Sequence, residues 1–308
     1  MEQKTAEAIF VVGLSRSGTT LMRRVLDSHS RIGIAGENHF VGHLLPREAV
    51  RNVIRGSGDL RDDATVRRLV DQIYGGRIRP RLSLRPQSPH WDWLVKKVPR
   101  EDLEARLLAG ERSERGIFTA IMRVYADRAG KEIMGEKTPA HLNWTDTLLA
   151  WYPGGRVIHM LRDPRGVYAS ELRRRMGKPG GAPYRWLVHV PPLLRLFLVV
   201  QVGLTWNGAV RRHRAFRFRY PDGYRLVRFE DMVREPEATI AGVCEFLGVD
   251  VEPAMLVQKV VSRGARLGEA GFDASAADRW RSEIGPGSTG WIARIVGRRL
   301  AEMGYPAG

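Results

Sequence analysis

Short apolar runs that end abruptly in polar residues are the main pattern of this chain. Five such runs lie at residues 8–12, 32–35, 133–135, 157–161 and 224–229. Continuous apolar runs of this length are typical of strands that are buried on both faces, as in parallel sheets. They predict an α/β protein with a central, mostly parallel sheet flanked by helices.

Polar residues follow directly after several of these runs. Glu37 comes after the second run, Lys137 after the third and Arg162 after the fourth. In open α/β sheets, ligands bind outside the carboxyl ends of the strands. If the runs are parallel strands of one sheet, these side chains converge on the loop that follows the first run, and the pattern predicts an enzyme.

The loop after the first run has the glycine spacing of a Walker A motif. Gly13 and Gly18 stand at the outer glycine positions, but Thr19 occupies the position where the motif requires lysine. A helix starting near Gly18 would point its positive dipole end at the loop. The loop also carries polar side chains, namely Arg16, Ser17, Thr19 and Thr20. Because a nucleoside triphosphatase needs the missing lysine, we expect a different phosphate-bearing ligand.

A second pattern suited to an anion follows the fourth run. Asp163 is a good N-cap residue, and Pro164 suits the first position of a helix. Ser170 then lies about two turns into the helix, and Arg174 is four residues later on the same face. Arg162, Ser170 and Arg174 are therefore predicted to hold one anionic group together.

The composition of the 308-residue chain is strongly basic. Fifty Lys and Arg residues stand against 34 Asp and Glu residues, which gives a formal net charge of +16. Polyanionic ligands, anionic membranes and nucleic acids all become candidate partners. No helix-turn-helix, zinc-finger or aromatic RNA-platform signature is present. We therefore expect no nucleic-acid partner.

Two features concern the compartment. The single cysteine, Cys244, lies in an apolar pattern and cannot form an intramolecular disulfide, which fits a reducing compartment. The phosphate loop begins at Gly13, which leaves no room for a cleavable signal peptide. We expect a cytoplasmic protein.

One segment, residues 187–204, is apolar enough to raise the question of a membrane. Two prolines and Arg195 interrupt it, so it lacks the continuous apolar span of a transmembrane helix. It predicts a core helix or a wall of an acceptor site. Peripheral contact with the cytoplasmic face of a membrane is the alternative, because arginines flank the segment.

These motifs together resemble the sulfotransferase family. Residues 16–23 and 26–29 resemble its 5′-phosphosulfate-binding loop, most closely in the tyrosylprotein and bacterial branches. Residues 137–139 resemble its second catalytic segment, and residues 162–170 its 3′-phosphate-binding segment. Weaker similarity continues at residues 206–207, 227–233 and 279–305. The resemblance covers residues 8–38, 132–175 and about 200–305.

The resemblance implies a P-loop-type three-layer fold and a reaction. A sulfuryl group would pass from 3′-phosphoadenosine 5′-phosphosulfate (PAPS) to an acceptor hydroxyl, with 3′-phosphoadenosine 5′-phosphate (PAP) as the product. Glu37 would take the acceptor proton, and Lys137 and Arg16 would stabilise the transferring group. The donor would be bound by Arg16, Ser17, Gly18, Thr19, Thr20, Arg162, Ser170 and Arg174. No metal is expected, because side chains supply the cations. The acceptor is expected to be a carbohydrate, a glycolipid or another small metabolite.

Several alternatives stay open from the sequence. The chain could be a nucleotide-dependent kinase with a degenerate P-loop, or a module that binds a nucleotide without chemistry. His39 competes with Glu37 for the role of base. Glu136 is expected to be a partner of Lys137 or Arg162 rather than a catalytic group.

The predicted organisation is a single domain over residues 1–308. A helical insertion at about 40–130 and an acceptor-side segment at about 176–205 are expected to shape the acceptor pocket, with Trp91 and Trp93 contributing. The oligomeric state is not predicted.

Overall fold

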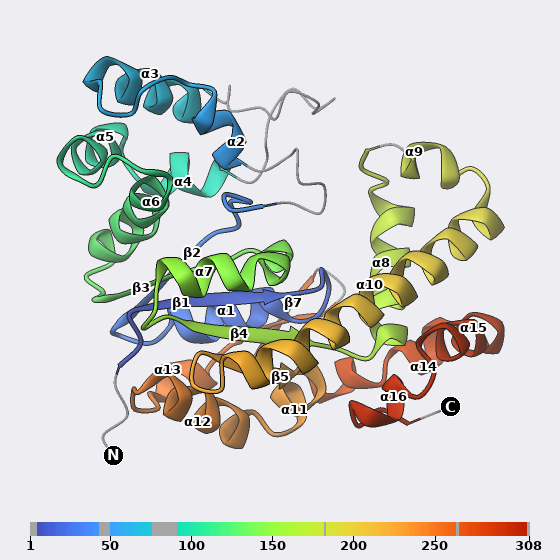
Figure 1. Ribbon diagram of the computed structural model, residues 1–308. Helices are drawn as coiled ribbons and strands as arrows, with labels where there is room; N and C mark the ends of the chain where they lie inside the picture. The colour runs from blue at the N-terminus through green and yellow to red at the C-terminus, as the bar shows by residue number, and fades with distance from the viewer. Residues whose placement is uncertain (1–4, 43–49, 76–90, 182, 263–264, 307–308) are drawn as a thin grey trace.

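The computed structural model describes residues 5–42, 50–75, 91–181, 183–262 and 265–306. Among these residues, five parallel strands form one sheet in the order β2-β3-β1-β4-β5 (Figure 1). The strands are β1 Ala8–Gly13, β2 Ile32–Ala35, β3 Ile133–Lys137, β4 Arg156–Leu161 and β5 Tyr224–Arg228. The predicted strands are all present, and the predicted α/β fold with a central parallel sheet is confirmed.

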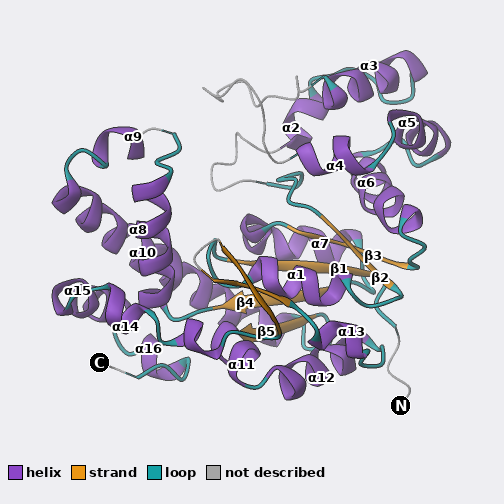
Figure 2. Ribbon diagram, turned by 180° about the vertical axis from the view of Figure 1, so that it is seen from behind, coloured by secondary structure: helices purple, strands orange, loops and turns teal. Residues whose placement is uncertain are grey.

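Helices cover both faces of this sheet (Figure 2). On one side of β1, Phe10 and Val12 pack in a core with α6 Glu114–Arg128, α7 Thr145–Trp151 and α10 Pro191–Arg219. On the other side, Ile9 and Val11 pack with α1 Thr19–Asp27 and α12 Pro236–Leu247. Side chains alternate between the two faces of a strand, so one strand serves both cores. The result is the predicted arrangement of three layers.

Along the chain, four further helices and α6 come between β2 and β3, in the range of the predicted insertion. They are α2 Val50–Arg55, α3 Asp63–Tyr74, α4 Asp92–Lys97 and α5 Arg100–Ala109. Residues 43–49 and 76–90 of that range lie outside the described residues. The division into a single domain with an insertion stays a prediction.

The remaining elements follow β3 in the chain. They are η2 Pro139–Trp144, α8 Pro164–Gly177, α9 Tyr184–Leu187, α11 Phe229–Arg234, α13 Pro253–Leu256, η3 Ala274–Ala277, α14 Trp280–Glu283, α15 Pro286–Val296 and α16 Arg299–Glu302. An antiparallel pair, β6 Lys259–Ser262 and β7 Ala265–Ala270, was not anticipated from the sequence. Some boundaries also differ: Glu136 and Lys137 belong to β3, Phe229 opens α11, and β1 and β4 are each one residue longer than their apolar runs.

The apolar segment at 187–204 becomes the first half of α10 together with the turn before it. Among the described residues, α10 alone has the length and composition to cross a membrane, and half of its apolar window is buried within the protein. Leu198, Val202 and Trp206 belong to the core, and the helix packs against α8 and α15. One face of α10 is therefore a core face.

Gly13 provides a direct test of the loop geometry. Its φ of 147° is rarely adopted by residues with a side chain, and an added Cβ would clash with the carbonyl oxygen of Met160 on β4. We expect Gly13→Ala to destabilise the protein by about 3 kcal/mol, measured by chemical unfolding. Gly177→Ala is the control, because an added Cβ there meets nothing within 4 Å. Equal stability of the two variants would contradict the strained loop.

Candidate functional site

The loop between β1 and α1 has the form expected of an anion-binding site. Gly18 is the N-cap of α1, in the left-handed region with φ 89°, and no side chain caps the helix. The N–H groups of the first turn are therefore available to a ligand. Arg16 is also left-handed, with φ 74°, a conformation that a residue with a side chain seldom adopts. The buried Ser17 Oγ has no hydrogen-bond partner among the described residues.

The two predicted anion-binding segments are in direct contact. The Arg16 Nε donates a hydrogen bond to Ser170 Oγ on α8, at 2.9 Å. The Nη1 of Arg162 donates to the carbonyl oxygen of Arg16, at 3.2 Å. These bonds join residues 146 and 154 positions apart along the chain. The loop and the start of α8 thus form one cationic cluster.

Arg162 holds this cluster together. Its Nη2 donates to the carbonyl oxygen of Ala276 at 2.8 Å, and its guanidinium lies 4.2 Å from the centre of the Phe229 ring. Burial lowers the pKa of Arg162 to about 10, so the side chain remains protonated at neutral pH. Arg162 is therefore a fixed positive charge, and it also fixes the backbone of the phosphate loop. The contacts with Phe229 and Ala276 have no signal in the sequence.

Arg174 lies at the outer side of the cluster. Its side chain is 43% exposed and pairs with Glu171, with 2.9 Å between Nη2 and Oε1. This hydrogen bond and the charge of Glu171 raise the pKa of Arg174. Its charge also interacts with those of Arg16 and Glu37. Its role as a phosphate ligand stays a prediction.

Glu37 and Lys137 form the second half of the site. Lys137 Nζ donates to Glu37 Oε2 at 2.8 Å, and Glu37 Oε1 lies 2.9 Å from His39 Nε2. Burial acts to raise the pKa of Glu37, but the imidazole of His39 and the charge of Lys137 outweigh it. They hold the pKa of this carboxyl well below its usual range. The Glu37 side chain is 29% exposed and that of His39 only 8%, so Glu37 is the more accessible of the two.

The register of the sheet brings the two halves together. Lys137 lies opposite Val11 on β1, and Gly13 lies opposite Met160 on β4. The ends of β3, β1 and β4 are thus adjacent. The prediction that Glu37, Lys137 and Arg162 share one edge of the sheet agrees with these contacts.

The prediction for Glu136 is wrong. This fully buried carboxylate contacts neither Lys137 nor Arg162 through a hydrogen bond; it accepts one from Thr138 Oγ1 at 2.5 Å and lies 2.7 Å from His141 Nδ1. The reason is strand alternation, because Glu136 and Lys137 both lie within β3 and point to opposite faces.

The Glu136 network supports the loop that carries Glu37. The N–H of Asn38 donates to Thr138 Oγ1 at 3.2 Å, and the N–H of Val41 donates to His141 Nε2 at 3.2 Å. Trp93 covers the same loop from α4, where its Nε1 donates to the carbonyl oxygen of Glu37 at 3.0 Å. Sequence reasoning missed these supporting roles.

A buried ion pair anchors the start of α8 to the end of the described chain. The fully buried Arg165 pairs with Asp163, with 2.7 Å between Nη2 and Oδ2, and also donates to the carbonyl oxygen of Pro306 at 2.9 Å. Glu230 accepts bonds from the Asp163 N–H and from Tyr305 Oη, each at 3.0 Å. The turn that carries Arg162 is therefore built from three distant segments.

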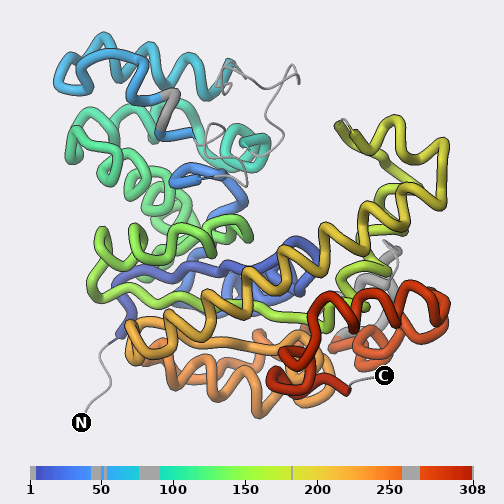
Figure 3. Tube along the Cα trace, turned by 45° about the vertical axis from the view of Figure 1, so that its right-hand side comes forward, coloured from blue at the N-terminus to red at the C-terminus, as the bar shows by residue number. Residues whose placement is uncertain are grey.

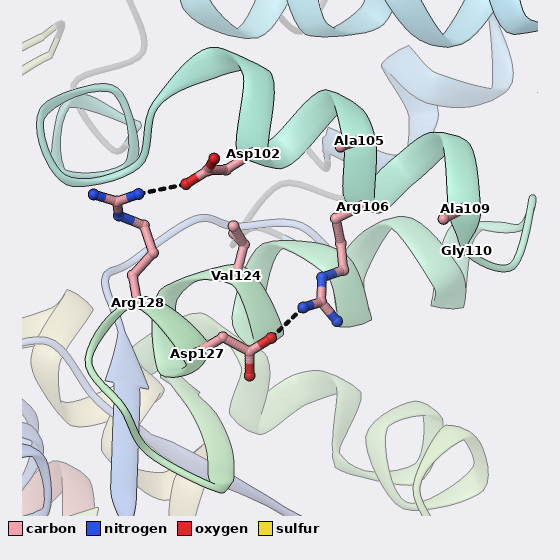
Figure 4. Close-up of a pocket in the computed structure, with 8 residues that line it drawn as sticks. All are labelled: Asp102, Ala105, Arg106, Ala109, Gly110, Val124, Asp127 and Arg128. Carbon is pink, nitrogen blue, oxygen red and sulfur yellow. Dashed lines mark hydrogen bonds and ion pairs between the residues drawn. The ribbon is translucent and has the colours of Figure 1, made fainter.

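A surface hollow lies away from this site, between α5 and α6 (Figure 4). Ion pairs of Arg128 with Asp102 and of Arg106 with Asp127 cross it. It contains none of the predicted site residues. Among the described residues, no three His, Cys, Asp or Glu side chains gather as potential metal ligands.

Comparison with curated proteins gives relatives of several kinds. A putative protein-tyrosine sulfotransferase of Caenorhabditis briggsae is 23% identical over 271 residues, which is 87% of this chain and 75% of the relative. Human carbohydrate sulfotransferase 5 is 36% identical over 110 residues, 32% of this chain and 25% of the relative. An uncharacterised protein of Aquifex aeolicus is 23% identical over 288 residues, 89% of this chain and 30% of the relative. The matched part spans less than a third of the last two proteins.

Solved structures show the same fold. The sulfotransferase domain of the curacin biosynthetic pathway has a TM-score of 0.56 and 18% identity, and 98% of this chain and 99% of that chain are covered. The sulfotransferase domain of the Synechococcus PCC 7002 olefin synthase has a TM-score of 0.51 and 22% identity, with 97% and 94% covered. A family model described as "Sulfotransferase family" matches residues 8–253. With most of its length matched and the site geometry described above, the chain belongs to the sulfotransferase family.

Proposed function

We propose that the protein transfers a sulfuryl group from PAPS to a hydroxyl acceptor. The observation that carries the proposal is the pairing of Glu37 with Lys137 beside the cationic cluster of Arg16, Arg162 and Ser170. A carboxylate and a lysine supply a base and an electrophilic stabiliser. The cluster supplies binding for a donor with phosphates at two positions.

The phosphate loop fits the 5′ side of such a donor. Ser17 Oγ is buried and has no hydrogen-bond partner among the described residues, and α1 begins at an N-cap without a side chain. An oxygen-rich group at the start of α1 would accept from both. Thr19, Thr20 and Gly18 complete the proposed contacts. Arg162, Ser170 and Arg174 would bind the 3′-phosphate.

The proposed reaction is a direct displacement at sulfur. Glu37 accepts the proton of the acceptor hydroxyl as its oxygen forms the new S–O bond, and the bond between sulfur and the 5′-phosphate oxygen breaks. Lys137 and Arg16 stabilise the negative charge that develops on the sulfuryl and leaving phosphate oxygens. PAP leaves with the electron pair of the broken bond. The low pKa of Glu37 rises once Lys137 turns toward the transferring group, which makes Glu37 a stronger base.

We propose a carbohydrate, a glycolipid or another small hydroxylated metabolite as the acceptor. Two considerations support this class: the match to human carbohydrate sulfotransferase 5 and the position of Trp93 beside Glu37. Aromatic side chains offer flat apolar surface with a polar edge. The proposal is specific to a hydroxyl nucleophile and leaves the acceptor open within that class.

Calorimetry without Mg²⁺ tests the donor site. PAP should bind tightly, and AMP and ATP much more weakly, because neither carries a 3′-phosphate. In Arg174→Ala, PAP affinity should fall by roughly 10- to 100-fold while AMP affinity is unchanged, since only PAP loses a charge-assisted contact. Arg100→Ala is the control, because Arg100 is an exposed arginine of α5 that pairs with Asp71, away from the site.

Two results would overturn this proposal. A preference for ATP with a strict Mg²⁺ requirement would favour the nucleotide-dependent kinase. Tight PAP binding without sulfuryl transfer to any hydroxyl in a panel of sugars, glycolipids and phenols would favour the non-catalytic binding module. Equal losses of PAP and AMP affinity in Arg174→Ala would remove Arg174 from the 3′-phosphate site.

A further inference from the structure

The first half of α10 is apolar on two opposite faces. Leu194, Leu198 and Val202 are buried against the body of the protein. The opposite face carries an exposed row at helical spacing, named here the α10 stripe: Leu193, Leu196, Phe197, Val200 and Leu204. At 100° per residue these five positions fall within one third of the helix circumference. A helix that is apolar all round normally has both faces covered.

In the part of the chain that the structure describes, the α10 stripe is open to solvent. Leu196 is 57% exposed and Leu204 is 60% exposed. Trp186 on α9 is 79% exposed, and Val190 in the turn between the helices is 50% exposed. The α9 helix and the adjoining end of α10 stand away from the sheet (Figures 1 and 3). Contiguous exposed apolar surface of this kind marks an interaction site.

The positive charge around the α10 stripe indicates an anionic partner. Residues 184–221 contain seven arginines and no Asp or Glu. Arg185 is exposed on α9 next to Trp186, and the exposed Arg211 continues the line of the stripe towards the C-terminal end of α10. Two copies of this surface would repel each other, which disfavours a symmetric dimer. An anionic surface with an apolar interior matches both properties.

We infer that the α10 stripe, with Trp186 and Val190, docks onto a lipid bilayer that carries anionic headgroups. The apolar side chains enter the interface between headgroups and acyl chains, and the arginines bind lipid phosphates. Tryptophan is enriched at this depth because it combines an apolar ring with a polar N–H group.

The packing of α10 favours docking along the membrane over a crossing of it. Trp206 is fully buried, and its Nε1 donates to the carbonyl oxygen of Arg162 at 2.9 Å. Gly203 packs closely against Ile295 of α15. Insertion of α10 through a bilayer would break both contacts and detach the helix from the cationic cluster of the site.

Side-chain contacts also connect the docking surface to α8, the helix that carries Ser170 and Arg174. The Arg175 guanidinium lies 3.3 Å from the centre of the Tyr184 ring, and Tyr184 in turn packs against Phe197 of the stripe. Arg175 shares Glu171 with Arg174. A docked protein therefore holds the outer edge of its site close to the bilayer surface.

Vesicle flotation tests this inference without donor or acceptor, so its outcome is independent of the proposed reaction. Binding should be strong with vesicles of phosphatidylcholine and phosphatidylglycerol, weak with phosphatidylcholine alone, and reduced by salt. The triple variant Leu193→Gln/Leu196→Gln/Leu204→Gln should bind at least about tenfold more weakly. Arg185→Ala should weaken binding about fivefold.

The matched control is Val257→Gln, at a valine that is 64% exposed beyond α13. It should bind vesicles like the unmodified protein. An unchanged thermal midpoint and far-UV circular dichroism spectrum show that the triple variant is folded. Two vesicle results would overturn the inference: no binding of the unmodified protein to anionic vesicles, or full binding of the triple variant. A third would come from sedimentation experiments: if the unmodified protein and Val257→Gln were dimers and the triple variant a monomer, the stripe would be a dimer interface.

Discussion

Glu37→Gln is expected to slow sulfuryl transfer by about 10²- to 10⁴-fold while leaving PAP affinity unchanged. The amide has nearly the volume of the carboxylate but cannot accept the acceptor proton. The rate is measured with labelled PAPS and the acceptor that the unmodified protein uses best in a panel of sugars, glycolipids and phenols. Glu37 is proposed to act on the acceptor proton in the transition state, so the loss should fall on kcat.

Two comparisons make this result specific. Glu132→Gln alters an exposed carboxylate that pairs with Arg31 at the start of β3, and it should leave the rate unchanged. His39→Asn tests the competing base. If Glu37→Gln retained full activity and His39→Asn abolished it, the base would be His39 and Glu37 would be its positioning residue.

Lys137→Met is expected to lower kcat by about 10²- to 10³-fold, since it removes a charge from the transferring group. It should also change the pH profile. Removal of the Lys137 charge raises the pKa of Glu37, which Lys137 helps to depress. Glu37 must be ionised to act as a base, so activity falls as the pH drops through its pKa. The acidic limb of the kcat/KM profile should therefore move to higher pH.

The control is Lys96→Met, which removes an exposed lysine from α4. It should leave both kcat and the acidic limb in place. An acidic limb that stayed fixed in Lys137→Met would show that Glu37 is not the group whose ionisation controls the rate. A loss confined to PAP affinity would make Lys137 a donor ligand only.

The strands and the meeting of Glu37 with Lys137 were predictable from the sequence. Strands buried on both faces leave continuous apolar runs, and parallel strands bring the residues after them to one edge. Contacts that do not follow from the shared edge of the parallel strands were not predictable. No local pattern indicates that Trp93 reaches the Glu37 backbone or that Phe229 lies against Arg162.

Glu136 shows why the remaining details could not be read from the chain. Its position next to Lys137 suggested an ion pair between neighbours. The strand extends two residues further than the apolar run, however, and alternation turns Glu136 to the face where His141 lies. The exact end of a strand therefore decided which partner a charged residue has.

The anchoring of Arg165 by Pro306 has a consequence for how the protein matures. The bond between them closes a segment of 141 residues, and the bond between Arg16 and Ser170 closes 154. Ordering such long segments is entropically costly until the last contact is available. During synthesis, a growing chain could assemble β1 and the phosphate loop early, but Arg165 would still lack its final acceptor. Competence to hold the donor should therefore appear late, after residue 306 has left the ribosome.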